Sequence, residues 1–251
     1  MFTLIAVLFC CIGIFKPVKV EAATPYGFNM VSGGKVSAGG ATFTAIQYKS
    51  GDSYYFKIVM KKNGRKKTLA TKAGAEFATN GSILYYVKTG SRTSDYRYRN
   101  TIYRYVIKTG KATKVTAGLN YTICGCSGDY LYYGIDNWAD GVKLYALNVK
   151  TKKKKYMTDG VGRVYISGKT VVTSTNSGDV DNYPIHSFQL NGSGKKKIDD
   201  GILLKVKNGK IYYCRYRYTS GDRYKVYTCS LNGKNKKAVT GWVSKIPAKY
   251  R

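Results

Sequence analysis

The chain has 251 residues, which is enough for one sizeable domain or two small ones. Its 43 Lys and Arg residues stand against 13 Asp and Glu residues, and the net charge of +30 favours polyanionic partners and opposes self-association. Six cysteines cannot form enough disulfide bonds to stabilise a chain of this length. This excludes a disulfide scaffold, so a hydrophobic core must stabilise the fold.

The first 23 residues have the pattern of a secretory signal peptide. Phe2 to Phe15 is almost entirely apolar, and Val20 to Ala23 ends in small residues. The apolar run is shorter than the roughly 20 residues that span a bilayer, so we do not expect a transmembrane anchor after processing. The sequence predicts a signal peptide at 1–23, an N-terminal extension at 24–42 and a secreted or extracellular protein near the cell wall.

The rest of the chain repeats one pattern. The segment LYALNVKTKKKKYMTDG at 144–160 has counterparts that begin at Tyr54, Thr101, Tyr183 and Tyr224. Their turns are anchored at Gly64, Gly110, Lys152, Gly192 and Gly233, which gives spacings of 46, 42, 40 and 41 residues. A fixed period in this range indicates a repeat architecture.

Each repeat contains four short strand-like pieces separated by Gly, Asn and Asp turns, and no segment has a sustained helical period. Repeats of roughly 40–45 residues with four strands each are typical of β-propeller blades. The sequence therefore predicts an all-β, single-domain propeller of five to six four-stranded blades, in which the 25 tyrosines mainly pack blade against blade. The predicted blades are 43–73, 74–117, 118–159, 160–200 and 201–251.

Two segments could close such a ring. WVSKIPAKYR from Trp242 follows the last basic strand and could complete the first blade. The alternative donor is FNMVSGGKVSAGG near the N-terminus, and an open arc is a further possibility.

Tyrosine pairs such as LYYG and IYYC, followed by basic hairpins of the LYALNV type, resemble secreted bacterial β-propeller repeat proteins, including domains of unknown function. These are related to the YWTD-type propellers of low-density-lipoprotein-receptor proteins and, more distantly, to TolB-like propellers. The resemblance covers about 43–251 and implies the fold. The YWTD tetrad is absent, so receptor-type ligand binding is not implied.

The lysines gather in one kind of turn. In an up-and-down sheet every second connection emerges at the same end, so the third-to-fourth-strand turns of all repeats should face one side. We expect a basic rim there that binds a polyanion, formed by Lys66, Lys67, Lys111, Lys152, Lys153, Lys154, Lys155, Lys195, Lys196, Lys197, Lys234, Lys236 and Lys237. The alternative is that these lysines only block edge-to-edge pairing of outer strands.

The acidic residues fall in the other connections and should lie at the opposite end, with Asp129 as the exception. They are Asp52, Asp95, Asp136, Asp140, Asp179, Asp181 and Asp222 between second and third strands, and Glu76, Asp159, Asp199 and Asp200 between repeats. The sequence thus predicts a disc with one basic and one acidic side.

Other candidate sites are weak. His186 has no marked catalytic or metal-binding partners. Alternation along a strand places Cys124 and Cys126 on one face, where we expect packing. Cys214 and Cys229 lie on the two arms of one hairpin and could form a disulfide. No metal or cofactor is expected.

We therefore expect a monomeric, non-catalytic binding or scaffold protein whose basic rim holds a polyanionic cell-envelope or extracellular ligand; nucleic acid is a less favoured partner. One alternative is a propeller carbohydrate hydrolase that uses loop carboxylates such as Asp136/Asp140 or Asp179/Asp181. Another is a platform for protein–protein interaction.

Overall fold

The computed structural model describes residues 34–51, 53–136, 141–175 and 183–251. The predicted signal peptide and most of the N-terminal extension lie outside the described residues. Within the described part the chain is built almost entirely of antiparallel strands, and its one helix is a short 3₁₀ turn, Ala248–Tyr250. No helix of this part is long and apolar enough to cross a membrane. The all-β prediction is confirmed.

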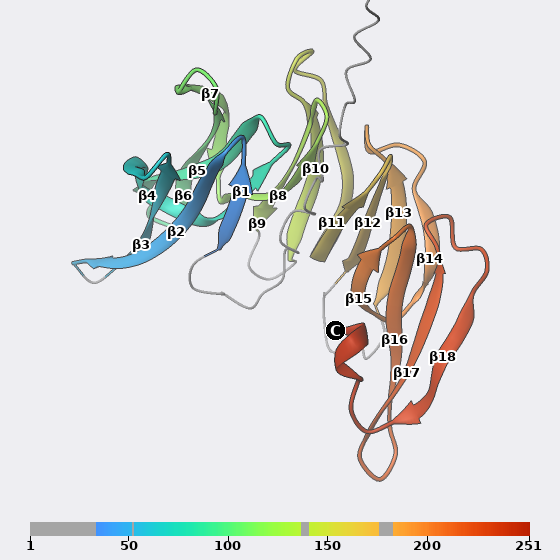
Figure 1. Cartoon of the computed structure of the whole chain (residues 1–251). Coiled ribbons are helices and arrows are strands. Elements are labelled where there is room, and N and C mark those ends of the chain that lie inside the picture. The colour runs from blue at the N-terminus through green and yellow to red at the C-terminus, as the bar shows by residue number, and fades with distance from the viewer. Residues whose placement is uncertain (1–33, 52, 137–140, 176–182) are drawn as a thin grey trace, which may run out of the picture.

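The strands form three sheets in sequence order (Figure 1). The first sheet contains β1 (Lys35–Ala38), β2 (Ala41–Ser50), β3 (Ser53–Lys62), β4 (Arg65–Thr79), β5 (Ile83–Arg92), β6 (Tyr98–Val106) and β7 (Lys111–Leu119). The second contains β8 (Tyr121–Ser127), β9 (Tyr130–Asp136), β10 (Val142–Asn148), β11 (Lys154–Ser167), β12 (Thr170–Thr175), β13 (Pro184–Gln189) and β14 (Lys196–Asp200). The third contains β15 (Ile202–Lys207), β16 (Lys210–Tyr218), β17 (Asp222–Ser230) and β18 (Lys237–Val243).

These sheets have seven, seven and four strands, where the sequence predicted separate sheets of four. The difference comes from two long strands, β4 with 15 residues and β11 with 14. The first part of β4 pairs with β3 and its last part pairs with β5, with register shifts between the two. β11 pairs in the same way with β10 and then with β12. The link between two repeats is therefore a bend within one continuous strand at these places.

The hydrophobic core lies between successive four-strand groups. One cluster joins Tyr85 and Ile102 of the first sheet to Leu131 and Tyr133 of the second. Another cluster joins the second sheet to the third and includes the fully buried Tyr213. The largest fully buried side chains are Tyr85, Tyr132, Tyr133 and Tyr213, all from the tyrosine-rich second pieces of the repeats. The prediction that tyrosines pack sheet against sheet is confirmed for these residues.

The ends of the described chain do not join. The segment Lys35–Ala38 pairs with β2, so the N-terminal candidate supplies the first strand of the first sheet. The C-terminal candidate forms the end of β18, and Ile246 and Tyr250 fold back onto the hydrophobic cluster of their own sheet. No strand pairing within the described ranges links β15–β18 to β1–β7, and Figure 1 shows these groups at opposite ends of the arrangement.

The predicted disulfide between Cys214 and Cys229 does not form. Cys214 lies opposite Val226 and Cys229 lies opposite Ile211, so the two cysteines are three positions out of register. An odd offset places them on opposite faces of the sheet, where they belong to different hydrophobic clusters. Both are buried free cysteines.

The predicted common face for Cys124 and Cys126 is also wrong. A register shift between Ile123 and Gly125 interrupts the pairing of β8 with β9, and Gly125 has a φ of 152°. The bulge turns the following residue over, so the two thiols pack in separate clusters.

We predict that Cys214 and Cys229 stay reduced and unreactive in the native protein. Burial raises the pKa of the Cys214 thiol to about 11 and also raises that of Cys229, so little thiolate is present at neutral pH. Alkylation before and after denaturation, followed by peptide mass mapping, should label both cysteines only in the denatured sample. A peptide pair linked through these two cysteines under non-reducing conditions would contradict the register.

Candidate functional site

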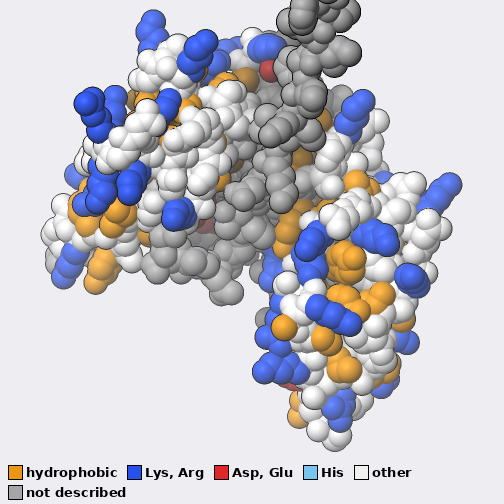
Figure 2. Space-filling model, in the orientation of Figure 1, with side chains coloured by type: hydrophobic (Ala, Val, Ile, Leu, Met, Phe, Trp, Pro, Cys, Tyr) orange, Lys and Arg blue, Asp and Glu red, His pale blue; other side chains and the backbone are white. Residues whose placement is uncertain are grey.

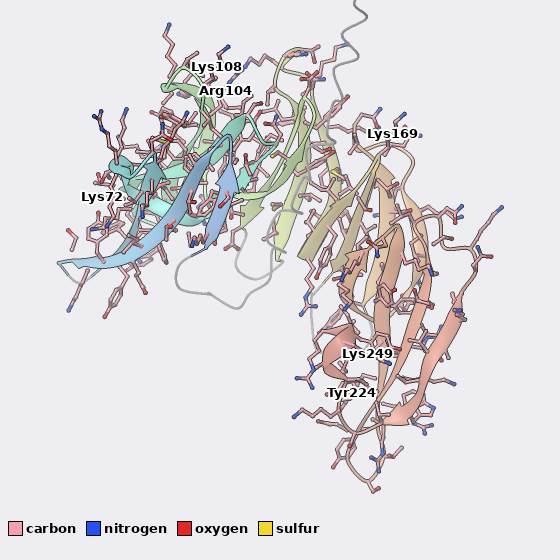
Figure 3. All side chains as sticks on the ribbon, viewed as in Figure 1. Lys72, Arg104, Lys108, Lys169, Tyr224 and Lys249 are labelled. Carbon is pink, nitrogen blue, oxygen red and sulfur yellow. The ribbon has the colours of Figure 1, made fainter. Side chains whose placement is uncertain are left out.

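The hairpins that carry the predicted basic rim emerge at one end of the strands. Figure 3 shows Lys108, of the β6–β7 turn, and Lys169, of the β11–β12 turn, at the upper ends of their sheets. Turns of neighbouring repeats also meet at this end. The contacts are Ile107 against Gly39, Asn80 Nδ2 to Gly128 O at 3.3 Å, Tyr132 Oη to Leu190 O at 2.7 Å, and Lys196 Nζ to Asn232 O at 2.7 Å.

Short polar side chains fix the conformation of these hairpins. In the β10–β11 turn the Asn148 carboxamide oxygen accepts hydrogen bonds from the backbone N–H groups of Lys150 and Thr151, both at 3.0 Å. Asn232 accepts in the same way from Lys234 N–H in the β17–β18 turn. Such turns satisfy their own backbone donors locally, so the adjacent lysine side chains are not needed to hold them.

All the predicted rim residues occupy these hairpins and are exposed. They lie at the start of β4, β7, β11, β14 and β18 or in the turns just before these strands: Lys66, Lys67, Lys111, Lys152, Lys153, Lys154, Lys155, Lys195, Lys196, Lys197, Lys234, Lys236 and Lys237. We call this set the lysine rim.

Several rim lysines are oriented by neutral partners. Lys154 lies over the ring of Tyr145, with its Nζ 5.1 Å from the ring centroid. Lys195 Nζ donates to Thr158 Oγ1 at 3.1 Å. These contacts direct the side chains without cancelling their charge. The nearby His186 has a lowered pKa, first because of burial and then because of the cations at Lys195 and Lys197.

A groove of about 400 Å³ opens at this end between the second and third sheets. Its walls come from the β11–β12, β13–β14, β15–β16 and β17–β18 turns and include Lys169, Lys196, Gln189, Ser230 and Asn232. Two cations and several hydrogen-bonding groups therefore face one concavity, which is large enough for a small anionic group.

Part of the predicted acidic side falls within the described residues. Asp95 and Asp222 lie at second-to-third-strand turns as expected, and Asp129 lies at the lysine end, 3.0 Å from Lys150 Nζ. Asp52, Asp140, Asp179 and Asp181 lie outside the described residues.

Basic side chains also occupy the end opposite the rim. The strands β16 and β17 carry Arg217, Arg223 and Lys225 near their lower hairpin. Figure 2 shows basic side chains over both halves of the visible surface and few acidic ones. The sequence analysis missed this group, although the alternation Arg-Tyr-Arg-Tyr at 215–218 is a signal that could have found it.

One carboxylate links the second and third sheets. Asp199 of β14 accepts hydrogen bonds from the Tyr213 hydroxyl, from Arg215 Nη2 at 2.9 Å and from Lys236 Nζ at 3.0 Å. Its side chain is only 9% exposed. Burial alone would raise its pKa, but the hydrogen bonds from Tyr213, Lys236 and Arg215 outweigh burial and lower the pKa to about 2. Lys236 is thus a rim residue whose charge is already compensated.

We predict that Asp199→Asn lowers the free energy of unfolding at neutral pH by roughly 1.5–3 kcal/mol, the usual contribution of hydrogen bonds to a charged group. Because the folded pKa lies below the ordinary value of 3.8, this stabilisation is present above about pH 4 and is lost as the pH falls towards 2. Denaturant unfolding of both proteins between pH 7 and pH 2 measures the difference.

The matched control is Asp200→Asn. Asp200 pairs with Lys197 at 2.8 Å, but both side chains are about half exposed, so the loss should be at most about 1 kcal/mol. Equal effects of the two substitutions, or a gap that persists at pH 2, would contradict the assigned role of Asp199.

The described residues contain no group of three or more His, Cys, Asp or Glu side chains that could hold a metal ion. The lysine rim and the groove beside it form an exposed cationic surface.

Comparison with known proteins shows the fold and no family. No known protein family matches the chain, and no curated protein sequence matches it. The β-propeller domain of the Trilobed protease from Pyrococcus furiosus is similar in structure over 82% of this chain and 70% of its own, with 9% identity and a TM-score of 0.58. The propeller fold that the sequence resemblance implied is therefore supported, whereas no family match supports the YWTD type.

Other similar structures have diverse functions. An acylaminoacyl peptidase of Pyrococcus horikoshii matches 82% of this chain at 13% identity and a TM-score of 0.58, but only 38% of the peptidase is covered. An oligogalacturonate lyase matches 82% of this chain and 64% of its own at 10% identity, with a TM-score of 0.55. At such identities the likeness establishes a propeller-like arrangement of sheets and assigns no activity.

Proposed function

We propose that this protein is an exported, non-catalytic binding protein whose lysine rim holds a polyanionic polymer of the cell envelope. The observation that carries the proposal is the convergence of exposed lysines from the β3–β4, β6–β7, β10–β11, β13–β14 and β17–β18 hairpins on one end of the strands. A net charge of +30 reinforces attraction to a polyanion and keeps copies of the protein apart, which favours a monomer.

The propeller-like fold supports this reading through geometry. If β4 and β11 each serve two neighbouring groups, the described strands form five four-stranded blades in an open arc. Each blade then presents one basic hairpin to the same side. Many weak contacts spread over one surface add to useful affinity for a repeating polymer through multivalency.

The alternative that the lysines only block edge-to-edge pairing accounts for lysines on the outer strands. It does not account for the lysines that lie in the turns before these strands. Lysines that block edge pairing are needed along the exposed edge of an outer strand. Here the longest cluster, Lys152 to Lys155, begins in the turn before β11 and ends at the second residue of that strand. The remaining exposed residues of the β11 half that pairs with β10 are Tyr156 and Asp159.

The hydrolase alternative would need two carboxylates across a cleft. Three of its four candidate acids, Asp140, Asp179 and Asp181, lie outside the described residues, so this alternative gains no support from the described part. Incubation of the protein with a panel of glycans, followed by reducing-end detection, tests it directly.

We predict that replacing Lys152, Lys153, Lys154 and Lys155 together by Gln weakens binding to poly(glycerol phosphate) at least tenfold at low salt. Each lysine that contacts a phosphate releases a counterion, so the variant's slope of log K against log salt should be shallower by up to roughly one unit per lost contact. Binding at several salt concentrations, measured by calorimetry, gives both quantities.

A control variant that loses the same number of charges elsewhere separates binding at the lysine rim from general attraction by the net charge. Lys49, Lys57, Lys88 and Lys143 lie on strands away from the lysine rim, and their joint change to Gln lowers the net charge by the same amount. This control should retain most of the affinity. If both quadruple variants lose the same affinity, or if binding does not depend on salt, the rim is not the binding site.

A further inference from the structure

The last sheet carries a second cationic surface, towards the β16–β17 hairpin, and Asp199, which binds both Arg215 and Lys236, lies between this surface and the lysine rim. The register of β16 and β17 places Arg215 opposite Lys225 and Arg217 opposite Arg223, all on one face. Trp242 of β18 lies opposite Lys225 on the same face. We call Arg215, Arg217, Arg223, Lys225 and Trp242 the arginine face.

The like charges on this face are set directly against each other. Opposite residues of an antiparallel pair have Cβ atoms about 4.5–5.5 Å apart, and like charges in that position destabilise the sheet. Asp199 pairs with Arg215, but no described carboxylate forms an ion pair with Arg217, Arg223 or Lys225. Arg223 and Lys225 are also partly buried, which increases the cost of leaving them unpaired.

Aromatic rings hold these cations in place. The Arg217 guanidinium carbon lies 3.9 Å from the centroid of the Trp242 ring. Arg215 and Lys225 lie 5.4 and 5.8 Å from the centroid of Tyr227. Trp242 itself is 36% exposed. A stacked guanidinium is pre-oriented, so its N–H groups can meet an oxyanion at little further cost in side-chain entropy.

We propose that the arginine face binds a linear acidic glycan, a polymer of sugar rings that each carry a carboxylate. The forked guanidinium groups match carboxylates in a bidentate manner. Cations on this face are spaced by about 5 Å across the strands and about 7 Å along them, so they suit charges carried on successive rings. The exposed part of Trp242 offers an apolar surface beside the cations on which a sugar ring can pack. This site is independent of the proposed role of the lysine rim.

Two other polyanions fit less well. Single-stranded nucleic acid needs a series of free aromatic rings for successive bases. Here Tyr213 is buried against the second sheet, and one side of Trp242 is occupied by Arg217. Inorganic polyphosphate has no sugar ring to pack on the tryptophan, and its charges lie closer together than the roughly 4.8 Å between neighbouring strands.

The two tryptophans of the chain allow a local measurement. Trp138→Phe leaves Trp242 as the only tryptophan, so its fluorescence reports on the arginine face. Titration of this protein with alginate, a linear uronate polymer, should change the Trp242 emission saturably. Adding Arg217→Gln and Arg223→Gln should weaken the response at least tenfold, whereas the quadruple lysine-rim variant should keep it.

A stability measurement distinguishes a binding role from a structural one. Because Arg217 and Arg223 repel each other, Arg223→Gln should raise the melting temperature or leave it unchanged while it weakens alginate binding. The variant in which both Arg217 and Arg223 are changed to Lys keeps the positive charge but loses the forked guanidinium groups. It should bind alginate with intermediate affinity, and it provides a test if the Gln variant does not fold.

Several results would overturn the proposal. These are no change in Trp242 emission with alginate, an equal change with neutral dextran, or a change at lower concentration with single-stranded DNA or polyphosphate of the same charge. Loss of the response in the lysine-rim variant would overturn it too, since the response would then belong to the rim. A lower melting temperature for Arg223→Gln would mark a structural role.

Discussion

The structure depends on sheets that are covered on both faces by their neighbours. Strands in such a sheet cannot alternate apolar and polar residues, so their middle positions must be apolar on both sides. Tyrosine meets this demand because its ring fills the interface between sheets while its hydroxyl reaches a carbonyl at the margin. Tyr132, whose hydroxyl donates to the Leu190 carbonyl at 2.7 Å, shows both functions in one residue.

This packing keeps charge out of the buried middle positions of the central strands and leaves the turns free to carry it. Lysine in the middle of β9 or β12 would be buried without a partner, whereas lysine in a hairpin turn stays in water. Since antiparallel strands reverse direction, every second turn lies at the same end, and a repeated sequence brings its basic hairpins together. The lysine rim is thus a consequence of repetition combined with a two-sided core.

The sequence correctly predicted features that are determined within a single repeat. Its predictions were wrong where the register between paired strands determines which face a side chain occupies. The all-β fold, the tyrosine packing and the hairpin positions follow from local pattern. The faces that Cys124 and Cys126 occupy depend on a bulge at Gly125, and the separation of Cys214 from Cys229 depends on the register of β16 and β17. Neither the bulge nor the register can be predicted from the spacing of the cysteines. The continuous strands were missed because their bends carry the same signals as a turn: β11 bends at Asp159-Gly160, where Gly160 has a φ of 63°.

The arginine face lies on the side of the third sheet that packs against the second sheet, and it exists because β16 and β17 are longer than the strands they pack against. β16 and β17 have nine residues each, whereas β12, β13 and β14 have five or six. The packing between these sheets extends to Tyr213 and Asp199, and the next outward residues on that face, beginning with Arg217, are no longer part of the core. Figure 1 shows the lower hairpin of β16 and β17 extending past the neighbouring strands. Strands that extend past their neighbours therefore permit this surface, and the charges that no described carboxylate matches are best explained by a partner that supplies carboxylates.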